Sequence, residues 1–408
     1  MFKLELTWDR PAKISSTQSK HTLRIRIIPQ TEGKDLPTLP CHLALALDTS
    51  MSMAGEKLQQ AKLACKTVVT QLRKSDRFSL ASFSTQVTTL IQGSSNEAEA
   101  KKAISELKPG GVTRTDLALN WLKTALPAEA GVARVGILIT DGQATNAGGM
   151  ILDDVNPLTN QAAELSDLGM TLCVVGLGDA ANFNTALLTD LSDKGKGAFL
   201  YADTPASLAP MLETTLRKSQ AIALLDAKLT LKPSPGVTIK GFCRYRPEYL
   251  PLEETAKNQL YLGTIAANKP TDILIALETP AATELGNTLG KREIIEVQLT
   301  GEGVSATEKA EINYTNSYRE AQQLNQEVDG DRLGWEINLY SKEIIDIGDS
   351  NPKRTGVLLE EIQIAAIKAG QNQIAEEAAK QNQELKQTGK LNPDRATGML
   401  RESRKLGE

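Results

Sequence analysis

Short apolar runs alternate with helix-patterned segments over residues 41–219, and this alternation limits the possible fold more than any other feature. The run HLALALD at residues 42–48 is almost wholly apolar, as in a strand that is covered on both faces. The next segment, residues 56–72, has its apolar residues at helical spacing. Further strands are expected at residues 77–83, 87–91, 135–140, 171–175 and 198–201, and further helices at 98–107, 116–126, 158–168, 184–191 and 207–219. Such alternation predicts an α/β domain at residues 41–220, with a doubly wound, mostly parallel sheet and helices on both faces.

The segments on either side of this domain have β patterns. Residues 1–40 contain LELTW and TLRIRII, in which apolar and polar residues alternate as in half-buried strands. Residues 221–314 contain runs such as AKLTLK, LYLGTI and DILIALE, which Pro, Gly and Asn interrupt, and they predict a β-sandwich. Since the N-terminal strands have no partners of their own, we expect them to complete its sheets. The α/β domain would then be inserted in the sandwich.

The C-terminal region, residues 315–408, is rich in Ala, Glu, Gln and Lys and is expected to be α-helical. The best-patterned helices are at residues 331–347, 357–368 and 373–385, and their apolar stripes must be buried against something. Packing within a small helical domain is one interpretation; docking of a partner or self-association is the other. The last stretch, residues 391–408, is polar and is expected to be frayed.

Oxygen-bearing side chains follow the predicted strands at the edge of a parallel sheet where ligands bind. The strand at 42–48 ends in Asp48 and is followed by Ser50 and Ser52; Thr113 lies in the loop before the helix at 116; Asp141 follows the strand at 135–140. Oxygen ligands select a hard cation, first Mg²⁺, with Mn²⁺ or Ca²⁺ as alternatives. We therefore predict that these five side chains form a metal site. Taken singly, the serines could instead cap the next helix, and the Asp-Gly at 141 could be a plain turn.

A metal bound in this way would favour one particular kind of ligand. Neutral hydroxyls do little to quench the charge of the cation, and the five side chains fill most but not all of its coordination positions. The remaining position would favour an incoming carboxylate. This arrangement can grip an Asp or Glu of another protein without a catalytic base.

The order of these motifs resembles a known family. DTSMS, then GGVTRTDLAL, then GILITDG are similar to a von Willebrand factor type A domain, whose metal-ion-dependent adhesion site has the pattern Asp-x-Ser-x-Ser, then Thr, then Asp. The resemblance carries over to the five residues above, continues through CVVGLGDAANFNTALLTDL and GAFLYADTPASL, and covers roughly residues 40–219. The flanking β segments resemble, more loosely, bacterial proteins in which such a domain is inserted in a β-sandwich.

Met51 departs from the family pattern, which usually has Gly between the two serines. If the backbone requires a positive φ there, Met costs about 1–2 kcal/mol. Its thioether, a poor ligand for Mg²⁺, would also lie over the ion if the loop tilted. Weakened metal binding, or a degenerate site that serves only as a scaffold, is therefore an alternative.

Composition excludes several functions. The net charge of −4 argues against a nucleic-acid binder that neutralises phosphates. With only two histidines and no Cys-x-x-Cys pair, neither a histidine-built zinc site nor a zinc knuckle is expected. No apolar run approaches the length of a membrane span, and the N-terminus lacks the apolar core of a signal peptide, so a cytoplasmic location is expected.

These observations favour a non-enzymatic bacterial adaptor that grips an acidic residue of a partner protein through a divalent metal. The family resemblance suggests partners such as ATPases or kinases of a multiprotein assembly. The alternative is a structural, self-assembling scaffold with a degenerate metal site. A hydrolase fits poorly because no general base is evident near the site, and an aspartyl phosphatase would need an Asp where this chain has Ser50. Lys57, Lys62 and Lys66, on the first helix of the α/β domain, are expected to form a solvated face.

Overall fold

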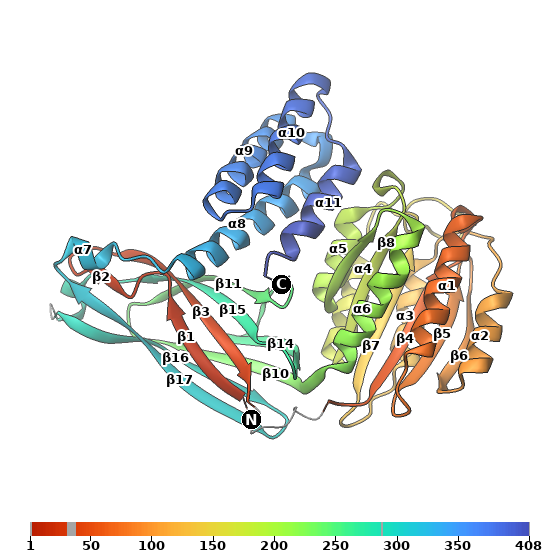
Figure 1. The fold of residues 1–408 in the computed structure, drawn as a ribbon, viewed down its shortest axis with the longest axis horizontal. Coiled ribbons are helices and arrows are strands. Elements are labelled where there is room, and N and C mark those ends of the chain that lie inside the picture. The colour runs from red at the N-terminus through yellow and green to blue at the C-terminus, as the bar shows by residue number, and fades with distance from the viewer. Residues whose placement is uncertain (1, 31–37, 287–288, 408) are drawn as a thin grey trace. The chain divides into compact units, whose positions relative to one another are not determined.

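The computed structural model describes residues 2–30, 38–286 and 289–407 (Figure 1). The chain divides into two compact units. The α/β unit contains Pro37–Leu225 and Asn392–Arg401, and the sandwich unit contains Met1–Leu36, Asp226–Leu391 and Glu402–Glu408. Each unit is described by itself.

The α/β unit is built on a sheet with the strand order β6-β5-β4-β7-β8-β9. Neighbouring strands are parallel except β6, which is antiparallel to β5. The strands are β4 (Cys41–Asp48), β5 (Arg77–Phe83), β6 (Val87–Ser94), β7 (Ala133–Thr140), β8 (Met170–Leu177) and β9 (Lys196–Ala202). The helices are α1 (Glu56–Thr70), α2 (Glu97–Glu106), α3 (Thr115–Ala125), α4 (Asn156–Asp167), α5 (Thr185–Lys194) and α6 (Leu208–Gln220), with short 3₁₀ turns η1 (Met51–Met53), η2 (Ala180–Asn182) and η3 (Pro205–Ser207).

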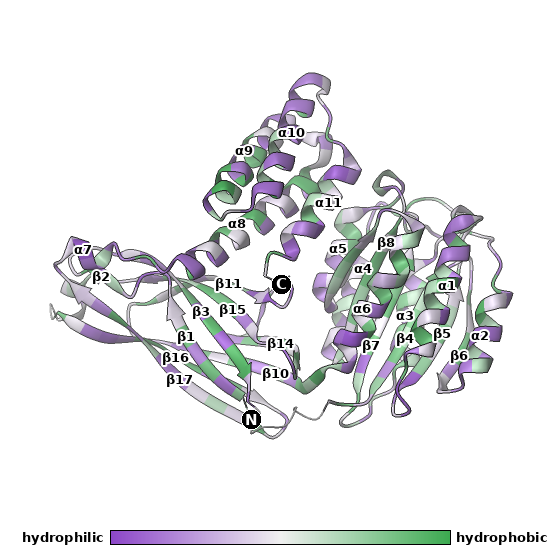
Figure 2. Cartoon of the chain, viewed as in Figure 1, coloured by the Kyte–Doolittle hydropathy of each residue, from purple (hydrophilic) through white to green (hydrophobic). Residues whose placement is uncertain are grey.

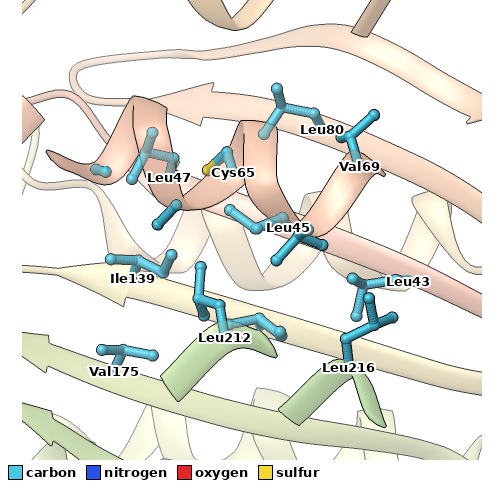
Figure 3. Packing of buried hydrophobic residues seen from close by; sticks show 14 of the residues in the cluster. Leu43, Leu45, Leu47, Cys65, Val69, Leu80, Ile139, Val175, Leu212 and Leu216 are labelled. Atoms are coloured by element: carbon cyan, nitrogen blue, oxygen red, sulfur yellow. The ribbon is translucent and has the colours of Figure 1, made fainter. Parts of the chain in front are cut away.

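Helices cover both faces of this sheet, as the uninterrupted apolar run of β4 predicts. Leu43, Leu45 and Leu47 of β4 pack in one core with residues of α1, α2 and α6, part of which Figure 3 shows. The alternate residues Ala44 and Ala46 face a second core with residues of α3, α4 and α5. In Figure 2 the hydrophobic colour follows the strands of this sheet. The predicted doubly wound, mostly parallel fold is confirmed.

The sandwich unit has two sheets, with strand orders β1-β3-β15-β11-β12 and β13-β14-β10-β16-β17-β2. Their strands are β1 (Phe2–Trp8), β2 (Ala12–Ile14), β3 (Ser19–Pro29), β10 (Ile222–Pro233), β11 (Thr238–Arg246), β12 (Leu250–Pro251), β13 (Glu254–Ala256), β14 (Gln259–Ala266), β15 (Thr271–Thr279), β16 (Gly290–Gly301) and β17 (Val304–Thr315), with a 3₁₀ turn η4 (Ala282–Leu285). β3 pairs with β15, and β2 pairs with β17. N-terminal strands therefore complete both sheets, and the α/β domain is inserted between β3 and β10.

The C-terminal region is helical, as expected. Its elements are α7 (Tyr318–Ala321), α8 (Gln326–Ile347), η5 (Gly348–Ser350), α9 (Pro352–Lys368), α10 (Asn372–Thr388) and α11 (Pro393–Arg404). Among the described residues, no helix has both the length and the apolarity needed to cross a membrane.

Buried ion pairs attach α8 to the sandwich. Asp331 of α8 is 4% exposed and accepts two hydrogen bonds of 2.8 Å from Arg246 of β11 and one of 3.1 Å from Arg24 of β3. Such a network fixes the helix at one position on the sheet, because a displaced helix would leave these charges buried and unpaired.

The expectation of a frayed C-terminal stretch is wrong, because residues of α11 are buried in the α/β unit. Asp394 accepts hydrogen bonds from the Ala180 amide (2.7 Å) and the Tyr201 hydroxyl (2.6 Å). Thr397, which is 1% exposed, shares a 2.9 Å hydrogen bond with Thr185. The polar residues that suggested fraying are therefore partners for polar groups of distant elements.

Candidate metal centre

Three loops meet at the carboxyl-terminal edge of the α/β sheet. β4 and β7 are adjacent and parallel, so Asp48 at the end of β4 and Asp141 directly after β7 lie at the same edge. The loop that carries Thr113 is joined to the loop after β4, because the Gly110 amide donates to the Thr49 carbonyl (2.7 Å) and the Met51 amide donates to the Gly111 carbonyl (3.2 Å). Gly111 has φ +84°, and a Cβ there would lie 2.5 Å from Thr85 Oγ1, so this close approach requires glycine.

Asp48 is completely buried and has neutral hydrogen-bond partners. The Ser50 amide donates to its Oδ1 (2.7 Å) and the Thr140 hydroxyl donates to its Oδ2 (2.6 Å). Burial raises the pKa of Asp48 to about 6, although the hydrogen bonds from Thr140 and Ser50 favour the charged form; the nearby charge of Asp141 also raises it. A buried carboxylate with such neighbours is stabilised by a cation.

The serine hydroxyls connect the first loop to Asp141. Ser50 Oγ and Ser52 Oγ are 3.1 Å apart, and Ser52 Oγ donates to Asp141 Oδ1 at 2.7 Å. Asp141 is completely buried, like Asp48. Four of the five predicted residues are thus connected by hydrogen bonds.

Thr113 lies beside this group. It is 5% exposed, and a Cβ at Gly142 would lie 3.3 Å from Thr113 Oγ1 and 3.6 Å from Ser52 Oγ. Both hydroxyls therefore lie close to Gly142, the residue after Asp141. The structure places all five predicted residues at one site.

Met51 does not strain the loop, and its side chain is exposed. Among the described residues other than glycine, positive φ values occur at Lys196, Asp226 and Asn258, so the anticipated conformational cost at Met51 is absent. Met51 is 64% exposed, whereas Ser50 beside it is 3% exposed. Most of the Met51 side chain is therefore in contact with solvent.

Two residues of this site were missed by the sequence analysis. Lys57, which was assigned to a solvated face, donates a 2.6 Å hydrogen bond to Asp141 Oδ2, and its side chain is only 26% exposed. Thr140, the donor to Asp48, was counted only as a strand residue. One feature of the sequence could have indicated that Lys57 belongs to the site: it lies in the first turn of the helix that follows the loop with Ser50 and Ser52.

The donor chemistry fits a hard divalent cation. The site gathers two buried carboxylates and three hydroxyls, so all its ligand atoms are oxygen, as Mg²⁺, Mn²⁺ and Ca²⁺ prefer. The two carboxylates carry a charge of −2 against one ammonium group. In the part of the chain that the structure describes, no three His, Cys, Asp or Glu residues form a cluster that could hold a metal. A metal bound here would therefore need the hydroxyls as well as the carboxylates.

Comparison with known proteins identifies the domain that carries this site. Residues 42–214 match the model of the von Willebrand factor type A domain. A solved structure described as a von Willebrand factor type A protein from Catenulispora acidiphila has a TM-score of 0.78, at 17% identity, over 99% of this chain and 96% of that one, so the entire fold is shared.

Two curated relatives are each 26% identical to this chain. They are "Uncharacterized protein sll0103" of Synechocystis sp., aligned over 66% of this chain, and "Uncharacterized protein YfbK" of Escherichia coli, aligned over 60%. The matches span 64% and 43% of those proteins' lengths. The fold, the motif order and the family match lead to one conclusion: residues 42–214 of the chain are a von Willebrand factor type A domain.

Proposed function

We propose that the protein is a non-enzymatic adaptor that binds an acidic residue of a partner protein through a divalent metal, first Mg²⁺, with Mn²⁺ or Ca²⁺ as alternatives. Residues 41–220 would be the binding module, residues 1–40 and 221–314 the sandwich that carries it, and residues 315–408 a helical region for support or a second partner. The observation that carries the proposal is the pair of fully buried carboxylates, Asp48 and Asp141: Asp48 accepts from a neutral amide and a neutral hydroxyl, and Asp141 accepts from the Lys57 ammonium group.

The metal would be held by Asp48, Ser50, Ser52, Thr113 and Asp141. When bound, it would supply a positive charge that neutral hydroxyls leave largely unquenched, and this charge attracts a carboxylate from outside. Domains of the matched family are typically protein-interaction modules.

The placement of His42 supports a binding role over catalysis. His42 is near the start of β4, the opposite end of the strand from Asp48, and its ring is 2.9 Å from the Ser79 hydroxyl. His42 is therefore not placed beside Asp48 to act as a general base.

We also propose a cytoplasmic location in a bacterium. All four cysteines are buried and none forms a disulfide, as expected in a reducing compartment. Burial raises the pKa of Cys41 and Cys65 to about 12, so these two thiols stay protonated and unreactive at neutral pH. The family resemblance suggests an ATPase or kinase complex as the partner.

Affinity purification from the native host tests the adaptor role. The tagged chain is used in Mg²⁺ and in EDTA, with the Asp141→Ala variant as a control. The proposal predicts proteins that are recovered with the unmodified chain in Mg²⁺ and lost in EDTA and in the variant. Identical sets of proteins under all conditions would contradict it.

One feature favours the alternative of a self-assembling scaffold. On α9, Val357, Ile364 and Ile367 are 46%, 49% and 59% exposed, and their spacing places them along one face of the helix. Sedimentation of the chain in EDTA tests this alternative: a scaffold predicts oligomers that Ile364→Glu disrupts, whereas an adaptor predicts monomers.

A further inference from the structure

Exposed apolar side chains gather beside the metal site. Within the α/β unit, the large hydrophobic residues that are exposed in the described part of the chain are Met51, Leu63, Met150, Ile151 and Leu168. Three of these are in the loops that build the site: Met51 lies between the two serines, and Met150 and Ile151 are in the segment that follows Asp141. Their exposed fractions are 64%, 68% and 57%. Apolar residues concentrated at one place on a surface mark an interaction site.

These residues are linked to one another by contacts between the loops. The Met51 amide donates to the Gly111 carbonyl, so Met51 lies against the residue before Val112. Val112, which is half-buried, is close to Gly149, because a Cβ at Gly149 would lie 3.1 Å from Val112 Cγ1. Met150 and Ile151 follow directly. We name Met51, Val112, Met150 and Ile151 the apolar rim.

The segment that carries Met150 and Ile151 is held in a fixed conformation. The Asn146 amide donates to the Met150 carbonyl (2.9 Å), the Met150 amide donates to Asn146 Oδ1 (3.1 Å), and Thr145 forms a β-bridge with Ile151. A held loop loses little conformational entropy when it binds a partner, and this favours affinity.

The same segment is attached to a predicted metal ligand. The Thr145 amide donates to the Thr113 carbonyl (2.9 Å), and the Thr113 amide donates to Thr145 Oγ1 (3.1 Å). The apolar rim and the oxygen cluster are thus parts of one rigid arrangement of loops.

We infer that the metal site and the apolar rim form one docking surface, and that its ligand is a segment of another protein in which an acidic residue is flanked by apolar side chains. The inference rests on the proposed function and adds the chemistry of the partner. Charge complementarity would select the acidic residue, since a bound divalent ion leaves the site, with Asp48, Asp141 and Lys57, at a net charge of +1. The methionines and Ile151 select its neighbours, and flexible methionine side chains adapt to apolar groups of different shape.

Selection from a peptide library tests this inference. Peptides with a fixed Asp and randomised neighbouring positions are selected on the full chain in Mg²⁺ and eluted with EDTA. We expect the eluted peptides to carry apolar residues next to the Asp. We also expect their affinity to fall by about tenfold or more for the triple variant Met51→Ser, Met150→Ser, Ile151→Ser.

A matched control is the double variant Leu63→Ser, Leu168→Ser, which removes two apolar residues of the same unit that are 54% and 46% exposed and are not part of the rim. It should bind the peptides as the unmodified chain does, and all three proteins should bind Mn²⁺ equally. Acidic peptides without apolar neighbours, or equal binding by the triple variant, would overturn the inference and leave the proposed function standing.

Two further outcomes would also contradict the inference. Self-association of the chain that the triple variant abolishes would mean that a second copy covers the rim. A selection that yields no peptide eluted by EDTA would overturn the proposed function and the inference together.

Discussion

Lys57 Nζ lies 2.6 Å from Asp141 Oδ2, so the first turn of α1 places an ammonium group against one of the two buried carboxylates of the metal site. A divalent cation that approaches Asp141 must share this carboxylate with Lys57. We therefore expect Lys57 to lower the affinity of the site for a metal and to stabilise the site without one.

Replacing Lys57 by methionine should raise the affinity for the metal and lower the stability of the metal-free protein. We expect Lys57→Met to bind Mn²⁺ about fivefold more tightly, because a repulsive charge on the order of 1 kcal/mol is removed. In EDTA its free energy of unfolding should fall by about 1–3 kcal/mol, because Asp141 loses its counter-ion. Calorimetric titration with Mn²⁺ and urea unfolding in EDTA measure the two effects.

Lys62→Met on the same helix is the matched control. Lys62 donates to the Ser105 carbonyl at 3.0 Å and not to a site carboxylate, so this variant should change neither property. Equal affinities for Lys57→Met and the unmodified chain would show that Lys57 does not compete with the metal.

Asp48→Asn should abolish metal binding and stabilise the protein in EDTA. The asparagine keeps the shape of the side chain: its oxygen can accept from the Ser50 amide and its NH₂ group can donate to the Thr140 hydroxyl. It removes a fully buried charge whose hydrogen-bond partners are neutral. We expect the free energy of unfolding at neutral pH to rise by about 1–3 kcal/mol. A loss of stability in EDTA would mean that the charge of Asp48 is already compensated in the fold.

In the sandwich unit, Asp331→Ala should be strongly destabilising. It would leave Arg24 and Arg246 without a shared buried partner, and we expect a loss of about 3–5 kcal/mol in unfolding free energy. Asp329→Ala is the control on the same helix, because its 2.8 Å pair with Arg332 is more exposed; it should cost under about 1 kcal/mol. Similar losses for the two variants in urea unfolding would contradict the role assigned to the buried network.

Lys13 should make the stability of the sandwich unit increase at alkaline pH. It is 2% exposed, donates to the Pro280 carbonyl at 2.6 Å, and burial lowers its pKa from 10.5 to about 8. Between these two values the unfolded chain keeps a proton that the folded chain has released, so the free energy of unfolding rises with pH. The expected gain is up to about 3 kcal/mol.

The Lys13→Met variant isolates this effect because it cannot titrate at position 13. The unfolding free energy of the unmodified chain minus that of the variant should grow as the pH rises from 8 to 10.5, the range set by the two pKa values. A difference that stays constant or shrinks would show that Lys13 keeps its proton in the fold.

The fold and the oxygen cluster were predictable from local patterns. The uninterrupted apolar run of β4 requires cover on both faces, and the order of Asp48, Thr113 and Asp141 after successive elements brings their side chains to one edge of a parallel sheet. The first argument depends only on neighbouring residues in the sequence. The second depends on the rule that parallel strands end at the same edge of a sheet.

Lys57, Thr140 and Asp394 could not be assigned in this way. A lysine on a helix has the same spacing whether it faces solvent or a neighbouring loop, and a threonine that ends a strand does not indicate which carboxylate it reaches. The partners of Asp394 are Ala180 and Tyr201, far away in the sequence, so its polar character alone suggested a solvated end.

The most direct test of the account is calorimetric titration of Mn²⁺ into the EDTA-treated full chain and into the double variant Asp48→Asn, Asp141→Asn. The account predicts that one ion binds to each unmodified chain and that the double variant, still folded, binds none. If the unmodified chain binds no metal, or if the double variant binds it equally well, the five oxygen-bearing side chains do not form a metal site.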